Sequence, residues 1–444
     1  MTMIELPDLT IAEIARALRG GQATVVDLIG ATLDRIAVRD PQIGAFVSVD
    51  GDAALRRAAV LDAELSRGDD RGPMHGIPIG IKDVVAVAGW PTGCGSFAAS
   101  PRPARVDATA VARLRVAGAI PIGRLATYEY ALSGPTFDGP VPPPRNPRDP
   151  TRITGGSSSG SAAAVAAGLV RVAVGTDTGG SIRAPAAYCG VVGLKSGRGA
   201  IPLDGVHPLS PSLDNVDAIG VTVAEAAVAS NIMAARPPHV PSLEGIRIGY
   251  GRSWSFDPRT APELVRRLDE TADVFAALGF PVEIVDLPDY APFETTGATI
   301  LRAEAWSVHR DAIARNGRSY GAAAREDLLS GSDLTETDLA DARRTADALS
   351  GHLRSAMADV SVLLLPTTLT PAPPLADFRD GPRWTAMRTI PFNVAGLPAI
   401  NVPCGTVDGL PVGLQIAGRT GSEAAICAVA AAYEAAAGHA VRRS

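Results

Sequence analysis

Short apolar runs alternate with amphipathic stretches along much of this chain. The runs at residues 77–81, 171–175 and 191–194 have the length and composition of buried strands. Between them lie stretches typical of helices that cover a sheet. The alternation from residue 77 to residue 194 therefore predicts a layered α/β core. Further strands are predicted at 45–49, 120–122, 245–250, 282–285, 361–365, 391–404 and 410–417, and helices at 24–38, 51–65, 108–117, 162–168, 181–187, 261–278, 301–330, 334–357 and 422–437.

Two loops rich in glycine and serine, residues 155–161 and 175–181, each precede an apolar stretch. A flexible linker is one interpretation, but linkers are not interleaved with core segments rich in valine and alanine. A phosphate-binding loop is a second, but neither loop holds a lysine or the G-x-x-x-x-G-K-[ST] pattern. Residues 156–160 also fit the G-x-S-x-G pattern of a nucleophile elbow, which needs a hydrophobic strand directly before it. Residues 142–154 are rich in proline and arginine and cannot form a central strand. The remaining interpretation is a site that uses one serine from each loop.

A third segment, HGIPIGIKD at residues 75–83, places Lys82 at the end of a short apolar strand. A lysine in that position commonly extends its amino group to water, which is the purely structural alternative. Together with GGSSSGSAAAVAAG (155–168) and GTDTGGSIRAPAAYCGVVGLK (175–195), the segment strongly resembles the amidase signature family. The resemblance covers at least residues 60–215. It returns in LLLPTT (363–368), PFNVAGLPAINVPCG (391–405) and GLPVGLQIAG (409–418).

The resemblance implies a catalytic triad with a defined order along the chain. The family's lysine falls on Lys82, its bridging serine on Ser157 and its nucleophile on Ser181. The bridging serine of the family follows a cis peptide bond, and its separation from the nucleophile fits the 24 positions found here. The resemblance also implies an oxyanion hole made by the backbone amides of Thr178, Gly179, Gly180 and Ser181.

The residue types make chemical sense for acyl transfer. A serine hydroxyl is a weak nucleophile until a base takes its proton. Histidine is the usual base, but of the six histidines only His75 lies near these motifs. A free lysine has a pKa of about 10.4, and burial among apolar strands and helices lowers that value. Ser157 would then pass the proton of Ser181 to Lys82.

Two segments supply candidate substrate contacts. In the family, the loop at 89–96 lies beside the active site, which makes Cys94 a candidate, although a packed loop is the alternative. The segment at 127–144 often lines the acyl pocket, with simple core packing as the alternative. Because this segment is apolar, a neutral aromatic or apolar acyl group is favoured over a dicarboxylic one. The candidates from this second segment are Tyr128, Tyr130, Ser133 and Phe137.

The chain also departs from the family pattern in two places. Ser196 stands where members usually carry proline after G-L-K. Asn215, Asp217 and Ala218 stand where members often read H-x-G-P. None of these positions belongs to the triad, but they argue against copying a substrate from any one relative.

Composition and charge narrow the class of protein. The net charge is −6 without long charged runs, which disfavours nucleic acid and anionic membranes as partners. No apolar run is long enough to span a bilayer, and no signal peptide is apparent, so a cytoplasmic enzyme is expected. The four cysteines are scattered without a C-x-x-C pair, which predicts free thiols and neither a metal nor a cofactor. A catalytic role for Cys94 or Cys189 is disfavoured because no histidine lies nearby in the sequence.

These observations predict one α/β domain over residues 1–444. The resemblance gives it the amidase-signature fold: a large mixed, mostly parallel β-sheet covered by helices on both faces. Its expected parts are N-terminal helices (1–60), a signature core (61–220), a variable substrate-covering region (236–390) and a C-terminal return to the core (391–444).

The predicted activity is serine hydrolysis of a small-molecule amide or amide-like C–N bond, in an anilide, urethane or other carbamate, by a monomer or homodimer. The alternative is the A subunit of a tRNA-dependent glutamyl/aspartyl amidotransferase, which uses the same triad to release ammonia for a partner chain.

Overall fold

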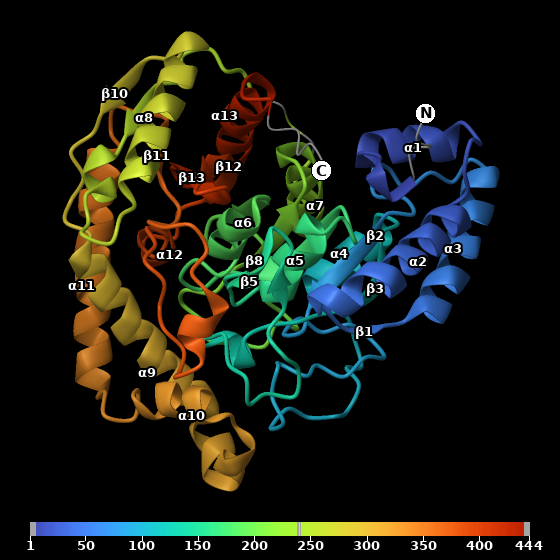
Figure 1. Cartoon of the computed structure of the whole chain (residues 1–444), viewed down its shortest axis with the longest axis horizontal. Coiled ribbons are helices and arrows are strands. Elements are labelled where there is room, and N and C mark those ends of the chain that lie inside the picture. Colours follow the sequence, from blue (N-terminus) through green and yellow to red (C-terminus); the bar gives the residue numbers. More distant parts are fainter. Residues whose placement is uncertain (1–5, 238, 240, 439–444) are drawn as a thin grey trace.

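A mixed β-sheet runs through the centre of the molecule (Figure 1). The computed structural model describes residues 6–237, 239 and 241–438, and within these residues eleven strands belong to this sheet. Their order across it is β1 (Phe46–Val49), β3 (Ile120–Leu125), β2 (Pro78–Lys82), β6 (Val172–Thr176), β8 (Val216–Gly220), β7 (Val192–Lys195), β12 (Ala399–Val407), β13 (Leu410–Gly418), β11 (Val362–Pro366), β9 (Ile248–Tyr250) and β10 (Val282–Ile284).

The directions of the strands divide the sheet into zones. Parallel pairing joins β3, β2 and β6 on one side and β11, β9 and β10 on the other. The central strands from β6 to β11 pair antiparallel, as does the edge strand β1 with β3. The predicted large mixed sheet is confirmed, but parallel pairing is confined to these two zones. One reason is the tight turn at Asp408 and Gly409, both with positive φ, which makes β12 and β13 a hairpin.

Helices cover both faces of the sheet, as predicted. Along β13, Gly413 faces Ala187 of α6 (Arg183–Cys189), whereas Gly418, five residues on, faces Ile426 of α13 (Glu423–Ala436). Because successive residues of a strand point to opposite faces, α6 and α13 lie on opposite sides. Strands β2, β3, β6, β7, β11 and β13 are accordingly buried along their whole length. Further helices of the core are α4 (Thr109–Val116), α5 (Ser159–Ala166), α7 (Val223–Met233) and α8 (Pro262–Ala277).

The N-terminal helices form a layer beside β3 (Figure 1). They are α1 (Ile11–Arg19), α2 (Val25–Ile43) and α3 (Gly51–Ser66). The sequence T-I-A-E at residues 10–13 predicts a capping box, and the box is present: each side chain accepts a hydrogen bond from the backbone amide of the other residue. Their buried faces join the hydrophobic core that continues to α13. No helix among the described residues is long and apolar enough to cross a membrane.

Two element predictions in the later part of the chain were wrong. The helix predicted over 301–330 is instead α9 (Ala291–Asn316), a short 3-10 turn (Gly317–Ser319) and α10 (Ala322–Leu329), because glycines at 317 and 321 interrupt it. The strand predicted over 391–404 begins with a helical turn, α12 (Pro391–Val394), with proline at its first position. The helix α11 (Glu336–Ala356) and a separate two-stranded sheet of β4 (Arg145–Asn146) and β5 (Asp149–Ile153) complete the α-helices and strands of the described residues.

Candidate active site

Lys82 ends strand β2 inside the molecule and does not extend to water. Its side chain is 0% exposed, and its Nζ donates to Ser157 Oγ and Thr176 Oγ1, each at 2.7 Å. Burial lowers the pKa of Lys82 from 10.5 to about 7, although Asp177 and Asp214 oppose that shift by favouring the charged form. A large share of the molecules therefore carries a neutral amine at neutral pH. His75, the alternative base, instead bonds the backbone of Arg71 and Leu61.

The first glycine- and serine-rich loop places Ser157 against this amine. The peptide bond between Gly156 and Ser157 is cis, as the resemblance implied. Ser158, the elbow candidate, is buried and hydrogen-bonded through its hydroxyl to the backbone of Thr176. Its amide donates to the carbonyl of Ser181 at 3.1 Å, which ties the two loops together. Ser157 and Ser181 line one pocket, whereas Ser158 holds the loops in position.

The second loop presents backbone amides beside Ser181. Among the described residues, no protein acceptor is bound by the amides of Thr178, Gly179 or Ser181. The amide of Gly180, by contrast, donates to Asp177 Oδ1 at 2.9 Å, so it stabilises the loop. Gly180 has a φ of +138°, and a Cβ there would lie 2.2 Å from Thr389 Oγ1. Three of the four predicted oxyanion donors are thus unoccupied, and the position of Gly180 requires glycine.

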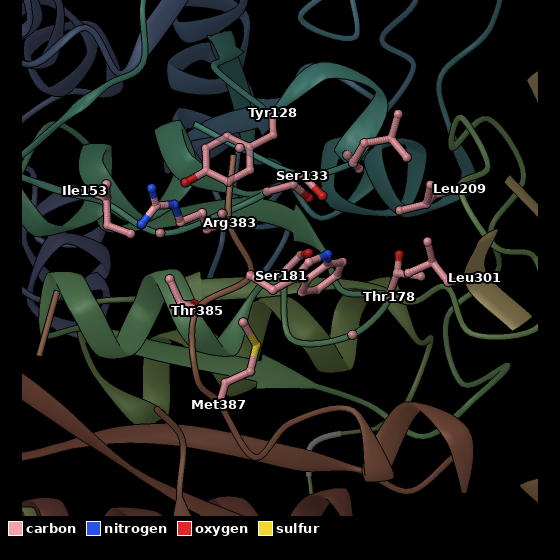
Figure 2. A pocket seen from close by; sticks show the side chains of 18 residues that line it. Tyr128, Ser133, Ile153, Thr178, Ser181, Leu209, Leu301, Arg383, Thr385 and Met387 are labelled. Atoms are coloured by element: carbon pink, nitrogen blue, oxygen red, sulfur yellow. The ribbon is translucent and has the colours of Figure 1, made fainter. Parts of the chain in front are cut away.

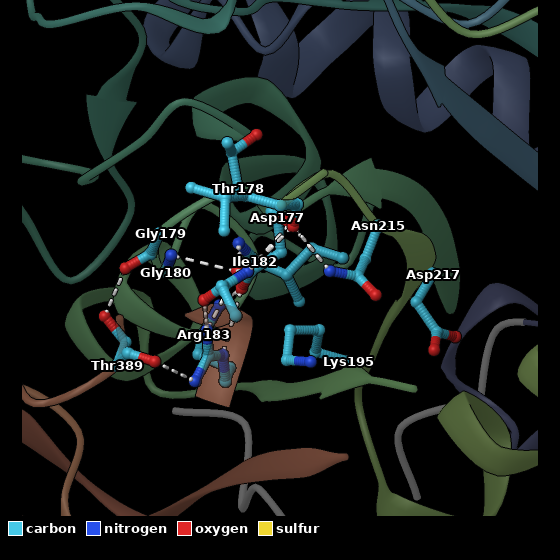
Figure 3. A network of polar contacts seen from close by, with 12 residues as sticks. Asp177, Thr178, Gly179, Gly180, Ile182, Arg183, Lys195, Asn215, Asp217 and Thr389 are labelled. Carbon is cyan, nitrogen blue, oxygen red and sulfur yellow. Dashed lines mark hydrogen bonds and ion pairs between the residues drawn. The ribbon is translucent and has the colours of Figure 1, made fainter. Parts of the chain in front are cut away.

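A buried ion pair under this loop was not singled out from the sequence (Figure 3). Asp177 and Arg183 are both fully buried and meet at 2.8 Å. Burial alone would raise the pKa of Asp177, but the charge and hydrogen bonds of Arg183 hold it well below its usual range. Arg183 also donates to the Thr389 carbonyl, Gln415 and Asn393, at 2.9, 2.6 and 2.7 Å. The GTDTGGSIR motif therefore contains both Ser181, the predicted nucleophile, and the ion pair that supports its loop.

The pocket above Ser181 draws its walls from distant segments (Figure 2). Of the predicted substrate contacts, Tyr128 and Ser133 line it. The region predicted to cover the substrate, residues 236–390, reaches the pocket through α9 and the segment before α12, but its match to the family motifs is too weak to predict most of the individual residues. The lining residues that were not predicted include Ile153, Leu209, Leu301, Arg383, Thr385 and Met387.

Three further residues were predicted to contact the substrate, but none belongs to the described lining of the pocket: Tyr130, Phe137 and Cys94. Tyr130 has a φ of +47° and turns into a ring cluster with His207, His309 and Tyr320. Phe137 is exposed and lies under the guanidinium of Arg379 at 5.6 Å. Cys94 is 1% exposed, and burial raises the pKa of its thiol. Burial likewise raises the pKa of Cys189 to about 12, so neither thiol is an available nucleophile.

The two departures from the family pattern meet in the structure. The amide and hydroxyl of Ser196 donate to Asp217 Oδ2 at 2.7 and 2.5 Å, and Asp217 is fully buried. Proline at position 196 could donate neither bond, and glycine at 217 could not accept them. Ser196 and Asp217 therefore depart from the family pattern together, because each supplies the hydrogen-bond partner of the other, and neither lines the pocket. Burial raises the pKa of Asp217 to about 6.

Comparison with known proteins agrees with this architecture. The family model described as amidase matches residues 27–427. The chain belongs to the amidase family. The predicted family is thereby confirmed, and with it a C–N bond as the target of the enzyme's chemistry. No group of three His, Cys, Asp or Glu side chains in the described part of this amidase is arranged to hold a metal ion.

Full-length relatives of this amidase differ in their named activities. The A subunit of the glutamyl-tRNA(Gln) amidotransferase of Chloroflexus aurantiacus is 35% identical over 477 residues, covering 97% of each chain. Its counterpart in Symbiobacterium thermophilum is 34% identical and covers 96% of each. Among solved structures, an amidase is 34% identical with a TM-score of 0.89, covering 96% of this chain and 99% of that one. A bacterial aryl acylamidase is 25% identical with a TM-score of 0.86, covering 98% and 99%.

Proposed function

We propose that this amidase cleaves an amide or amide-like C–N bond through an acyl-enzyme on Ser181. The observation that carries the proposal is the buried 2.7 Å hydrogen bond from Lys82 Nζ to Ser157 Oγ, because Ser157 lines the same pocket as Ser181. A lysine with a pKa of about 7 can act as a base at neutral pH. The described lining of the pocket contains no histidine, aspartate, glutamate or lysine that could act as the base instead.

In the proposed acylation step, Ser181 Oγ forms a bond to the carbonyl carbon of the substrate. Its proton passes to Ser157, whose own proton passes to the neutral amine of Lys82. The carbonyl oxygen takes up negative charge near the amides of Thr178, Gly179 and Ser181. When the intermediate collapses, the C–N bond breaks and the leaving nitrogen receives the proton from Lys82 through Ser157. Water then attacks the ester by the same route, which releases the acid and restores Ser181.

The test is covalent labelling by a fluorophosphonate, read by intact-mass spectrometry and peptide mapping. We expect one adduct per chain, on Ser181, and none in Ser181→Ala. Ser158→Ala is the matched control and should still be labelled, because Ser158 bonds the backbone of Thr176. An adduct on Ser158 would overturn the assignment and support a nucleophile elbow.

A second function is favoured by the curated relatives, which at 35% identity over nearly the whole chain are amidotransferase A subunits. In that role the triad would hydrolyse the side-chain amide of glutamine and pass ammonia to a partner chain. Glutamine carries an α-ammonium group, which a binding site would pair with a carboxylate. The described lining directly around Ser181 contains no aspartate or glutamate. Asp327 and Glu294 line two adjoining cavities, each of which shares Leu301 and Trp384 with this pocket. The relatives therefore favour the amidotransferase, whereas the pocket favours a free amidase of small molecules.

Hydrolysis assays of the purified chain, with and without partner subunits, distinguish these two functions. A free amidase, as a monomer or homodimer in the cytoplasm, hydrolyses small amides, anilides or carbamates without other subunits. An amidotransferase component would release ammonia from glutamine, and strongly only after its partner subunits are added. Hydrolysis of small amides by the lone chain at rates that partner subunits leave unchanged would support the free amidase.

A further inference from the structure

Arg383 brings a positive charge to the pocket of Ser181. It lies on the segment between β11 and α12, and Figure 2 shows it above Thr385 and beside Ile153. Within the described residues, its guanidinium has neither a carboxylate within ion-pair distance nor a hydrogen-bond acceptor. Arg383 is exposed, so water solvates its guanidinium in the free protein, and an anion that enters the pocket can replace this water.

The other arginines of this segment are engaged. Arg388 is buried, pairs with Asp257 at 2.8 Å and lies 4.1 Å from the ring centre of Tyr290. Arg379 lies over the ring of Phe137, and neither of these arginines lines the pocket. Arg383 therefore differs from its neighbours both in its place and in having no polar or aromatic partner among the described residues.

The rest of the pocket also suits an anion. Its described lining contains hydroxyl groups from Tyr128, Ser133 and Thr385 but no carboxylate, whereas the hydroxyl of Thr178 donates to Asp214 at 2.6 Å and is not free to donate to a ligand. Burial raises the pKa of Tyr128, so its hydroxyl keeps its proton and can donate. In the view of Figure 2, this hydroxyl lies on the same side of the pocket as Arg383. A substrate carboxylate there would meet donors, whereas a substrate ammonium would meet a like charge.

We propose that Arg383 binds a carboxylate on the substrate, so that this amidase prefers amides that carry a free carboxylate and no ammonium group. The inference rests on the proposed function and names its substrate class. The apolar segment at 127–144 by itself favours a neutral acyl group. The proposal replaces that expectation, because the fold also brings Arg383 to the pocket.

Three primary amides of equal chain length test the preference. Glutaramate is glutamine without its α-amino group, and pentanamide is the same chain without either charge. We expect kcat/KM to be highest for glutaramate, exceeding both glutamine and pentanamide by about tenfold or more, the size of a charge-assisted hydrogen bond at a partly exposed site. Ammonia release by the purified chain is the measurement.

Variants connect the preference to Arg383. Arg383→Gln should lower the ratio of kcat/KM for glutaramate to that for pentanamide by about tenfold, and Arg383→Lys should restore part of it. The matched control is Arg379→Gln, four residues earlier on the same segment, which should leave the ratio unchanged. An equal loss for both substrates in Arg383→Gln would overturn the inference, because a structural role predicts that result.

The remaining outcomes separate this inference from the proposed function. Preference for glutamine overturns the inference and supports the amidotransferase, and preference for pentanamide overturns it in favour of an apolar acyl group. Cleavage of none of the three overturns it as well. In each case the fluorophosphonate adduct on Ser181 still decides independently whether the chain is a serine hydrolase.

Discussion

Lys82→Arg is expected to lower kcat/KM at neutral pH by about two to four orders of magnitude, the usual contribution of a general base. A guanidinium remains protonated in proteins and cannot accept the proton of Ser157. Lys82→Ala should lose at least as much, because Ser157 and Thr176 also lose their hydrogen-bond donor. Steady-state rates on a cleaved amide, with folding checked by circular dichroism, measure the effect.

The pH dependence follows from the same group. With a pKa of about 7, Lys82 gains its neutral form as pH rises, so kcat/KM of the wild type should increase through about pH 7 and then level off. The folded pKa lies below the unfolded value of 10.5, so the unfolded chain binds more protons between these values. The contribution of Lys82 to the free energy of unfolding therefore rises with pH across that window.

Lys195, a second buried lysine, provides the control for assigning the pH profile to Lys82. Burial lowers the pKa of Lys195 to about 7 as well, but its Nζ donates to the carbonyls of Ser196 and Leu397. Lys195→Met should therefore leave the midpoint of the pH profile in place. A shifted midpoint in this variant, or a folded Lys82→Arg enzyme with near wild-type activity, would contradict the role given to Lys82.

Asp177→Asn is expected to destabilise the protein by about 3–5 kcal/mol, because it leaves the buried guanidinium of Arg183 without its counter-charge. Activity should fall with it, since Asp177 holds the amides of Gly180 and Ile182 on either side of the nucleophile. Urea unfolding followed by circular dichroism gives the loss of free energy, and kcat on the folded fraction gives the loss of activity.

An exposed pair offers the matched comparison for that substitution. Asp69 lies 3.5 Å from Arg67, and both side chains are more than half exposed. Asp69→Asn should cost less than about 1 kcal/mol, as is usual for surface pairs. Similar losses in both variants would mean that the buried pair does not organise the loop.

The fold class and the lysine and serine motifs could be predicted because each lies in one unbroken stretch of sequence. Residues 75–83, 155–168 and 175–195 each combine a strand or helix with the residue that it presents. The capping box of Thr10 and Glu13 could also be predicted, because both residues lie within one short stretch of sequence. The network around Arg183 could not be predicted because its acceptors come from residues near 390 and 415, which no local pattern connects to residue 183.

The pocket walls were predicted less well for a geometric reason. The segment at 127–144 lacks a regular period, so the sequence does not indicate which side chains face the pocket. Tyr130 turns away through its positive φ, and its neighbour Tyr128 remains in the wall. Leu301 and Arg383 come from segments with little family likeness, and only the folded chain brings them to Ser181.

The hydrogen bonds of Arg183 have a consequence for folding during synthesis of the chain. Its acceptors at Thr389, Asn393 and Gln415 follow it along the chain by 206 to 232 residues. Lys82, Ser157 and Ser181 are therefore synthesised long before the segments that support the loop of Ser181. A nascent chain that ends before them would hold Lys82, Ser157 and Ser181 without a completed oxyanion site. If Ser181 is the nucleophile, as proposed, hydrolytic activity is expected only after these supporting segments have been synthesised and have packed against its loop.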